Sequence, residues 1–142
     1  MLHSFDDIQG VSPPGRLFLP VTYFTQLGDA REPVRARVQQ VVQELPKVYP
    51  YSRVFQLLLD HGLRSKVAKT RQLALDELGA VLRRSGLAAC EPGKACPVIA
   101  SMIADKDPNV RKAALSTLRY IGCHLHSWTL LIVLFAAARC TL

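Results

Sequence analysis

The 142-residue sequence predicts an all-α protein, built as an α-solenoid of about three antiparallel helical pairs. Three observations lead to this prediction: an Arg-led segment occurs three times, its apolar residues recur at helical spacing, and Pro and Gly separate the segments. With 49% hydrophobic and 20% charged residues, the composition excludes a disordered or collagen-like chain. The length suits one domain.

The repeat is clearest around Arg35, Arg71 and Arg111, which are 36 and 40 positions apart. In each copy a Val or Thr precedes the Arg, a small or β-branched residue follows it three positions later, and an apolar residue follows seven positions later. This spacing is close to the period of HEAT-type helical pairs, about 40–47 residues. Because one pair cannot bury its apolar face alone, we expect the pairs to stack.

Each Arg-led segment is expected to form the second helix of a pair. The apolar residues that share one helical face are Val34, Val38, Val41, Val42 and Leu45 in the first copy, Leu75, Leu78 and Leu82 in the second, and Val110, Ala114, Leu118 and Ile121 in the third. Pro33 and Pro108 suit the first position of a helix, and Asp107 suits the N-cap before Pro108. Gly86 is expected to end the second of these helices.

The first helix of each pair is predicted at residues 17–27, 51–63 and 95–104, with Ser52 as the N-cap of the middle one. Turns within pairs follow at 28–32, 64–68 and 105–107, and longer breaks lie at 46–50 and 85–94. The domain organisation we expect is an irregular leader at 1–15, a repeat domain at 16–122 and an apolar tail at 123–142.

The positive charge is concentrated in the second half of the chain. The formal net charge is +7, from 18 Lys and Arg against 11 Asp and Glu. Residues 1–63 carry six of each sign, whereas residues 64–122 carry eleven basic and five acidic residues. We therefore expect the second half to face an acidic partner.

Three further strings stand out in the sequence: Lys-Val-Tyr-Pro at 47–50, Leu-Arg-Ser-Lys at 63–66 and Asp-Lys-Asp-Pro-Asn-Val-Arg-Lys-Ala-Ala-Leu at 105–115. In this order they resemble TOG domains, in particular the second half of the last TOG domain of the ch-TOG/Minispindles family of microtubule polymerases. The resemblance runs from about residue 18 to residue 122 and implies the last three or four of six HEAT repeats. The opening repeat, with its tryptophan-bearing turn, has no match, and residues 123–142 depart from the family pattern.

The resemblance implies a non-enzymatic module that grips αβ-tubulin or the microtubule lattice with the turns inside its repeats, as a fragment of a plus-end polymerase or spindle-assembly factor. It also implies a cytoplasmic, cytoskeletal location at microtubule plus ends, the spindle or the centrosome. The turn residues that would contact tubulin are Arg31, Arg64, Ser65, Lys66, Lys69, Lys106, Asn109 and Lys112. A different interpretation is that these residues only keep an apolar solenoid soluble.

Arg35, Arg71 and Arg111 recur at one repeat position, and we expect them to be structural. In stacked helical pairs such an Arg bonds a turn carboxylate or carbonyl, for which Asp29 and Asp107 are candidates.

Other chemistries find little support in the sequence. Neither a metal nor another cofactor is expected, because Cys90 and Cys96 are six apart and no second pair stands at zinc-finger spacing near Cys123, His124 and His126. No nucleophile elbow, phosphate-binding Gly loop or His-Glu-x-x-His string occurs, so we expect neither an enzyme nor a small-molecule substrate.

The remaining partner classes are weighed on charge and hydropathy. Nucleic acid fits the basic charge but not the lack of exposed aromatics among the basic residues, so we do not expect it. The apolar run at 128–138 is about half of the ~20 residues that a membrane span needs. Four unevenly placed cysteines fit a reducing compartment. The alternative function is a generic HEAT scaffold for another acidic protein or nucleic acid.

Overall fold

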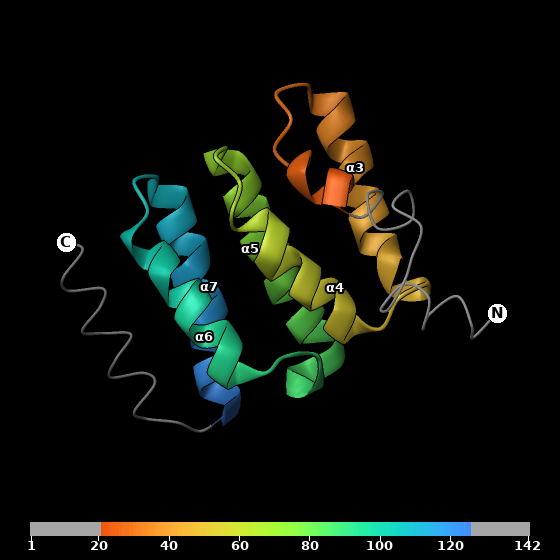
Figure 1. The fold of residues 1–142 in the computed structure, drawn as a ribbon. Helices are drawn as coiled ribbons and strands as arrows, with labels where there is room; N and C mark the ends of the chain where they lie inside the picture. The colour runs from red at the N-terminus through yellow and green to blue at the C-terminus, as the bar shows by residue number, and fades with distance from the viewer. Residues whose placement is uncertain (1–20, 126–142) are drawn as a thin grey trace.

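The computed structural model describes residues 21–125, and every helix in this range belongs to one of three stacked pairs. The predicted leader at 1–15 and the apolar run at 128–138 lie outside the described residues. Figure 1 shows the second helices of the pairs side by side, with the three turns inside the pairs at one edge of the stack. The all-α solenoid is therefore confirmed.

The helices follow the predicted order. The first pair consists of helical residues 21–25 and α3 (Glu32–Glu44), which a 3₁₀ turn at Leu45–Lys47 extends. In the second pair, α4 (Tyr51–Leu57) continues into a π-helical turn at Leu58–Gly62, and α5 (Ala68–Ser85) ends in a 3₁₀ turn at Gly86–Ala89. The third pair is α6 (Pro92–Ser101), a 3₁₀ turn at Met102–Ala104, and α7 (Pro108–Leu125).

Two predicted helix ends are found in the structure. Asp107 caps α7, because its Oδ1 accepts hydrogen bonds from the backbone N–H of Asn109 at 2.8 Å and of Val110 at 3.3 Å. Gly86 ends α5 with a φ of 68°, a conformation that favours glycine. Pro108 is the first residue of α7, as the sequence predicted, whereas α3 begins at Glu32 and Pro33 is its second residue.

Three predicted boundaries differ from the structure. Ser52 is not an N-cap: the extended Pro50 holds that position, and its carbonyl accepts the N–H groups of Arg53 and Val54. α6 begins at Pro92 instead of residue 95, because proline suits the first helical turn. α7 continues to Leu125, three residues past the expected domain boundary at residue 122.

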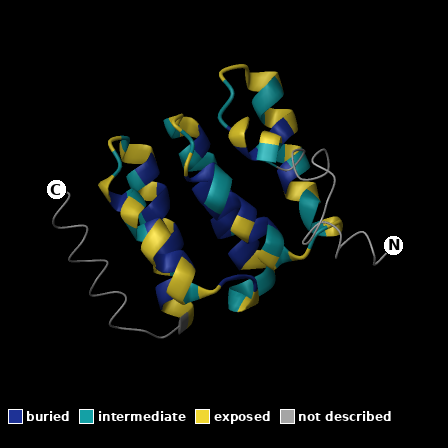
Figure 2. Ribbon diagram, viewed as in Figure 1, coloured by how far each residue is buried: buried dark blue, intermediate teal, exposed yellow. Residues whose placement is uncertain are grey.

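The core lies between the two layers of helices, where Figure 2 shows the buried faces turned toward each other. The largest fully buried side chains are Phe24, Leu27, Phe55, Leu58, Leu63, Leu75, Leu78, Leu82, Ile99, Ile103, Leu118 and Ile121. On α3, Val38 and Val42 are buried, but Val34 and Val41 are only half-buried. Helices α5 and α7 thus bury more of their predicted apolar faces than α3 does.

Helices approach closely at two glycines, one between pairs and one within a pair. A Cβ atom on Gly28 would lie 2.3 Å from the backbone nitrogen of Thr70, so the first turn sits directly on the start of α5. A Cβ on Gly62 would lie 2.5 Å from the Cβ of Ala74, which brings the end of the second pair's first helix onto α5. Within residues 21–125 we find no helix long and apolar enough to cross a membrane.

Candidate functional site

The three turns share one hydrogen-bonding pattern, set by the repeated arginines. In each repeat the Nη1 of the Arg donates to the backbone carbonyl six residues earlier, so the guanidinium closes the turn ahead of its own helix. The distances are 2.9 Å from Arg35 to Asp29, 2.8 Å from Arg71 to Ser65 and 2.8 Å from Arg111 to Asp105.

The residue whose carbonyl accepts the Arg also folds its own side chain back onto the turn. In each case a side-chain oxygen accepts the backbone N–H two residues further along, which is the geometry of an Asx or Ser turn. The pairs are Asp29 Oδ1 with Arg31 at 2.8 Å, Ser65 Oγ with Val67 at 3.2 Å, and Asp105 Oδ1 with Asp107 at 2.9 Å. The three turns therefore have the same hydrogen-bond pattern, although the middle turn carries Ser instead of Asp.

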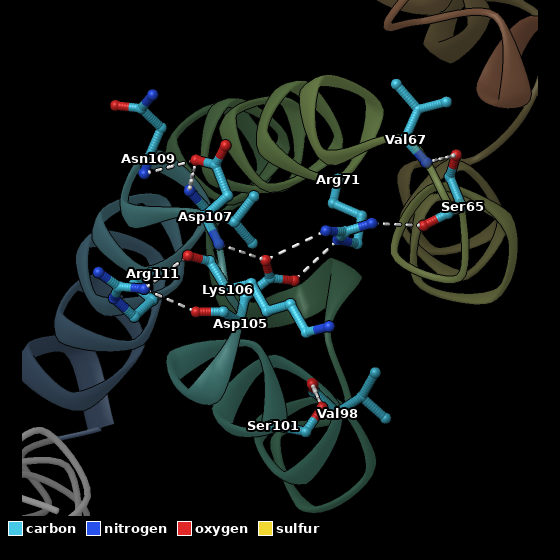
Figure 3. Close-up of polar contacts among 11 residues, drawn as sticks. Ser65, Val67, Arg71, Val98, Ser101, Asp105, Lys106, Asp107, Asn109 and Arg111 are labelled. Atoms are coloured by element: carbon cyan, nitrogen blue, oxygen red, sulfur yellow. Dashed lines mark hydrogen bonds and ion pairs between the residues drawn. The ribbon is translucent and has the colours of Figure 1, made fainter. Parts of the chain in front are cut away.

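Asp105 also ties the third pair to the second (Figure 3). Its carboxylate accepts Nε of Arg71 at 2.8 Å and Nη2 of Arg71 at 3.1 Å, with side chains only 17% exposed for Arg71 and 10% for Asp105. Burial alone would raise the pKa of Asp105, but hydrogen bonds from Arg71 and from the Asp107 N–H, with the charges of Arg71 and Arg111, bring it below its ordinary value.

Asp107 is not the partner of Arg111. The Nη1 of Arg111 donates to the carbonyls of Asp105 and Lys106, while the Asp107 carboxylate is engaged at the start of α7. The prediction that Arg111 bonds a turn carbonyl is therefore confirmed, but the prediction of Asp107 as its partner was wrong. For Arg35 the named candidate, Asp29, is the acceptor.

The structure brings the predicted partner-binding residues onto one edge, because they lie in the three turns or in the first turns of α5 and α7. We call this surface the turn edge. Its exposed members are Arg31, Arg64, Lys66, Lys69, Lys106, Asn109 and Lys112, whereas Ser65 is half-buried.

The charge of the turn edge is largely uncompensated. Arg31 pairs with Asp29 in its own turn at 3.2 Å. The other five exposed cations have no salt bridge within the described part of the chain; they are Arg64, Lys66, Lys69, Lys106 and Lys112. The N-termini of α3, α5 and α7 face the same edge and add the positive end of each helix dipole. The edge is thus arranged to attract an anionic surface.

The buried cysteines offer no reactive group. Burial raises the pKa of Cys90 to about 11, with smaller contributions from Cys96 and Glu91, so its thiol stays protonated at neutral pH. Among residues 21–125 there is no group of three His, Cys, Asp or Glu side chains that could hold a metal ion.

The sequence reasoning missed the contacts that join neighbouring pairs. Thr70 is fully buried, and its Oγ1 accepts the N–H of Gly28 at 3.1 Å. The Asp105 carboxylate was not singled out either. A signal was present for Asp105, because Asp29, Ser65 and Asp105 have the same spacing as the three arginines.

Comparison with known proteins identifies the repeat. The HEAT repeat family model matches residues 95–122. The chain is 36% identical over 102 residues to "Protein mini spindles" of Drosophila melanogaster, and 31% and 30% identical over the same length to "Protein MOR1" of Arabidopsis thaliana and of Oryza sativa subsp. japonica. Each match covers 72% of this chain but only 5% of the relative, so the chain spans a small part of these proteins.

Solved structures give the same answer for the fold. A structure described as "TOG-tubulin binding specificity promotes microtubule dynamics and mitotic spindle formation" matches with a TM-score of 0.71 and 28% identity, over 84% of this chain and 46% of that one. The "Crystal Structure of MAST/Orbit N-terminal domain" matches with a TM-score of 0.69 and 23% identity, over 82% and 58%, and supports the fold alone. The chain is therefore a HEAT-repeat α-solenoid with the fold of a TOG domain, homologous to the mini spindles and MOR1 proteins.

Proposed function

We propose that this chain is a non-enzymatic TOG-type module that binds αβ-tubulin or the microtubule lattice through its turn edge. The observation that carries the proposal is the gathering of exposed cations without salt-bridge partners, from turns that are far apart in sequence, onto one edge of the stack. The homology to mini spindles and MOR1, and the likeness to a structure described by TOG–tubulin binding, support tubulin as the partner.

The physical basis of the interaction is electrostatic complementarity. Tubulin is an acidic partner, and a basic edge steers its approach and fixes its orientation more than it adds raw affinity. A single module of this kind is expected to bind weakly and to depend on neighbouring modules in a longer chain for tight association. The module would then concentrate tubulin at growing microtubule ends or on the spindle, and polymerase activity is not expected from it alone.

The proposal is tested by reversing two charges on different turns. Lys66→Glu combined with Lys106→Glu should lower the affinity for tubulin by about five- to tenfold and flatten its dependence on salt, because two favourable charges become repulsive. The measurement is co-sedimentation with stabilised microtubules across a salt series, together with sedimentation velocity on free tubulin. Circular dichroism checks that both substitutions leave the helices intact.

A matched control separates the turn edge from general basicity. Arg84 lies at the C-terminal end of α5, Arg119 lies in the second half of α7, and both are exposed and away from the turns. Arg84→Glu with Arg119→Glu changes the net charge by the same amount and should leave tubulin affinity nearly unchanged. Equal weakening by both double variants would refute a specific edge. No weakening by the turn variant would favour a HEAT scaffold for another acidic protein.

A further inference from the structure

The middle turn lacks a carboxylate that the other two turns possess. Ser65 occupies the position of Asp29 and Asp105, because each of the three side chains accepts the N–H two residues ahead and each carbonyl accepts the repeated Arg. The Ser65 hydroxyl closes its turn as the carboxylates do, but it brings no charge. Phosphorylation of Ser65 would therefore place a negative charge at the position where the other two turns carry a carboxylate.

The missing carboxylate matters because Asp105 receives an Arg from the preceding pair. Arg71 reaches forward to Asp105 with Nε and Nη2. By the repeat spacing, the counterparts of this pair one repeat earlier are Arg35 and Ser65. The second and third pairs are thus joined by an ion pair, whereas the equivalent position between the first and second pairs has no charged acceptor.

Arg35 instead directs its Nη2 to a residue of its own helix. Its Nη2 forms an ion pair with Glu32, whose side chain is 74% exposed, and its Nε has no hydrogen bond within residues 21–125. The counterpart of Glu32 in the second pair is Ala68, so Arg71 has no such competitor. Arg35 therefore retains donors for a stronger acceptor placed at position 65.

We propose that Ser65 is a phosphorylation site whose phosphate is bound by Arg35, which completes between the first and second pairs the bridge that Arg71 and Asp105 form between the second and third. A protein kinase would transfer the γ-phosphoryl group of ATP to the Ser65 Oγ, breaking the bond to ADP and releasing the hydroxyl proton. The product carries a charge of about −1.5 to −2 and three strong acceptor oxygens, which suit the planar Arg fork.

The surroundings of Ser65 favour this modification. The neighbouring residues Arg64 and Lys66 are exposed cations with no salt bridge among the described residues, so an added dianion meets positive charge on both sides. The inference concerns the fold and needs no partner. If the turn edge binds tubulin, the same phosphate would also lower that affinity, a consequence that rests on the proposed function and is measured separately.

The decisive experiment compares the full 142-residue chain with and without phosphoserine encoded at position 65. We expect the phosphate to raise the melting temperature by about 4 °C, because a modest gain in unfolding free energy shifts the melting temperature of a domain of this size by a few degrees. In an Arg35→Gln background the rise should vanish, and in a Glu32→Ala background, where Arg35 has no competing carboxylate, it should be at least as large. Asp105→Ser, which removes the existing bridge to Arg71, should lower the melting temperature. The size of this decrease gives a reference for the rise expected from the phosphate.

Two results would overturn the proposal: a melting temperature that the phosphate does not raise, or an equal rise with and without the Arg35 side chain. If Arg35→Gln fails to fold, Arg35→Lys keeps the charge without the planar fork and should retain less than half of the rise. Phosphopeptide mapping of the chain from dividing cells completes the test. A phosphate on Ser65 supports the site, and an unmodified Ser65 at full peptide coverage through the division cycle argues against it.

Discussion

The two junctions between helical pairs use different chemistry, although they join copies of one repeat. Between the second and third pairs, the Arg71–Asp105 ion pair lies at the turn edge. Further along, the Thr117 hydroxyl shares its one proton between the carbonyl of Ala113 in its own helix, at 3.0 Å, and that of Leu75 in α5, at 3.2 Å. The Tyr120 hydroxyl donates to the carbonyl of Leu82 in the last turn of α5 at 3.3 Å. This junction is fastened by a charge at one end and by hydroxyl hydrogen bonds along its length.

Between the first and second pairs the contacts are neutral at the turn and charged in the middle. Gly28 donates to Thr70 at the turn edge. Half-way along, the buried Glu77 accepts the side-chain amides of Gln39 at 3.3 Å and Gln43 at 3.2 Å. Because an amide donor carries no charge, the buried Glu77 side chain is held at this junction by neutral donors, with no ion pair among residues 21–125. The repeat thus fixes the backbone register, while the side chains at each junction decide how it responds to substitution and pH.

The largest effect is expected from Asp105→Ala. This change leaves the buried guanidinium of Arg71 without its carboxylate and removes the turn contact to Asp107, so the free energy of unfolding should fall by about 3 kcal/mol. The matched variant is Asp29→Ala, which removes the equivalent turn contact together with the ion pair to Arg31. Because that ion pair lies within one turn and joins no two repeats, the loss of unfolding free energy should be much smaller. Urea denaturation of both variants compares them. Equal losses would mean that the bridge between repeats adds nothing.

The same bridge predicts how stability changes in acid. Asp105 has a pKa below the ordinary 3.8, so its contribution is fully present above the pKa of the unfolded chain, at about 4, and is lost as the pH falls through the lower folded value. The difference in unfolding free energy between the unsubstituted chain and Asp105→Asn should therefore be constant from pH 7 to about pH 5 and shrink below pH 4. Denaturation curves at four or five pH values measure this difference, and a difference that grows in acid would reverse the sign of the argument.

At the first junction the largest effect is expected from Gly28→Ala. The new Cβ would lie 2.3 Å from the backbone nitrogen and 2.4 Å from the Oγ1 of Thr70, and a helix backbone cannot yield as a flexible side chain does. We expect a loss of about 1–3 kcal/mol, the usual range for overpacking, together with faster amide hydrogen exchange in α3. Unchanged exchange in α3 would mean that the first turn is not held by its contact with α5.

A smaller effect is expected from replacing both Gln39 and Gln43 by Ala. Each amide donates one hydrogen bond to Glu77, and each bond contributes about 1 kcal/mol. The pair of changes should therefore cost about 2 kcal/mol, and the Glu77→Gln variant, which keeps an acceptor oxygen at the same place, should cost less. Thermal unfolding of the three variants makes the comparison, and a larger loss in Glu77→Gln would show that the charge itself stabilises the junction.

The elements of the fold were predictable because the signals for them are local. The spacing of Arg35, Arg71 and Arg111 gave the three pairs, and Asp107 and Gly86 marked helix ends by chemistry that acts within a few residues. The prediction of Ser52 as an N-cap was wrong because α4 begins at Tyr51, directly after the extended Pro50, which is the N-cap residue. The gathering of the basic turn residues on one edge followed from the repeat, since equivalent positions in stacked units lie on the same side.

The junction contacts could not be predicted with the same method. Gln39 and Gln43 precede Glu77 by 38 and 34 positions in the sequence. Nothing local distinguishes these three residues from exposed polar residues on a helix. Which of the two turn carboxylates, Asp105 or Asp107, meets an Arg depends on the stacking of one pair on the next. That stacking is decided by packing over long sequence separations, which a pattern of helical periodicity does not contain.

Gly93→Ala provides the smallest effect and a baseline for the glycine comparison. Gly93 lies in the first turn of α6, is exposed, and has nothing within 4 Å of the position where a Cβ would stand. Since alanine reduces the entropy of the unfolded chain and favours helix, this variant should raise the unfolding free energy by about 0.5 kcal/mol. The same substitution at Gly28 has the opposite expected sign, so the difference between the two variants isolates the steric contact with Thr70 from the general effect of removing a glycine. If both variants stabilised the protein, the first turn would have room beside Thr70 that the structure does not show.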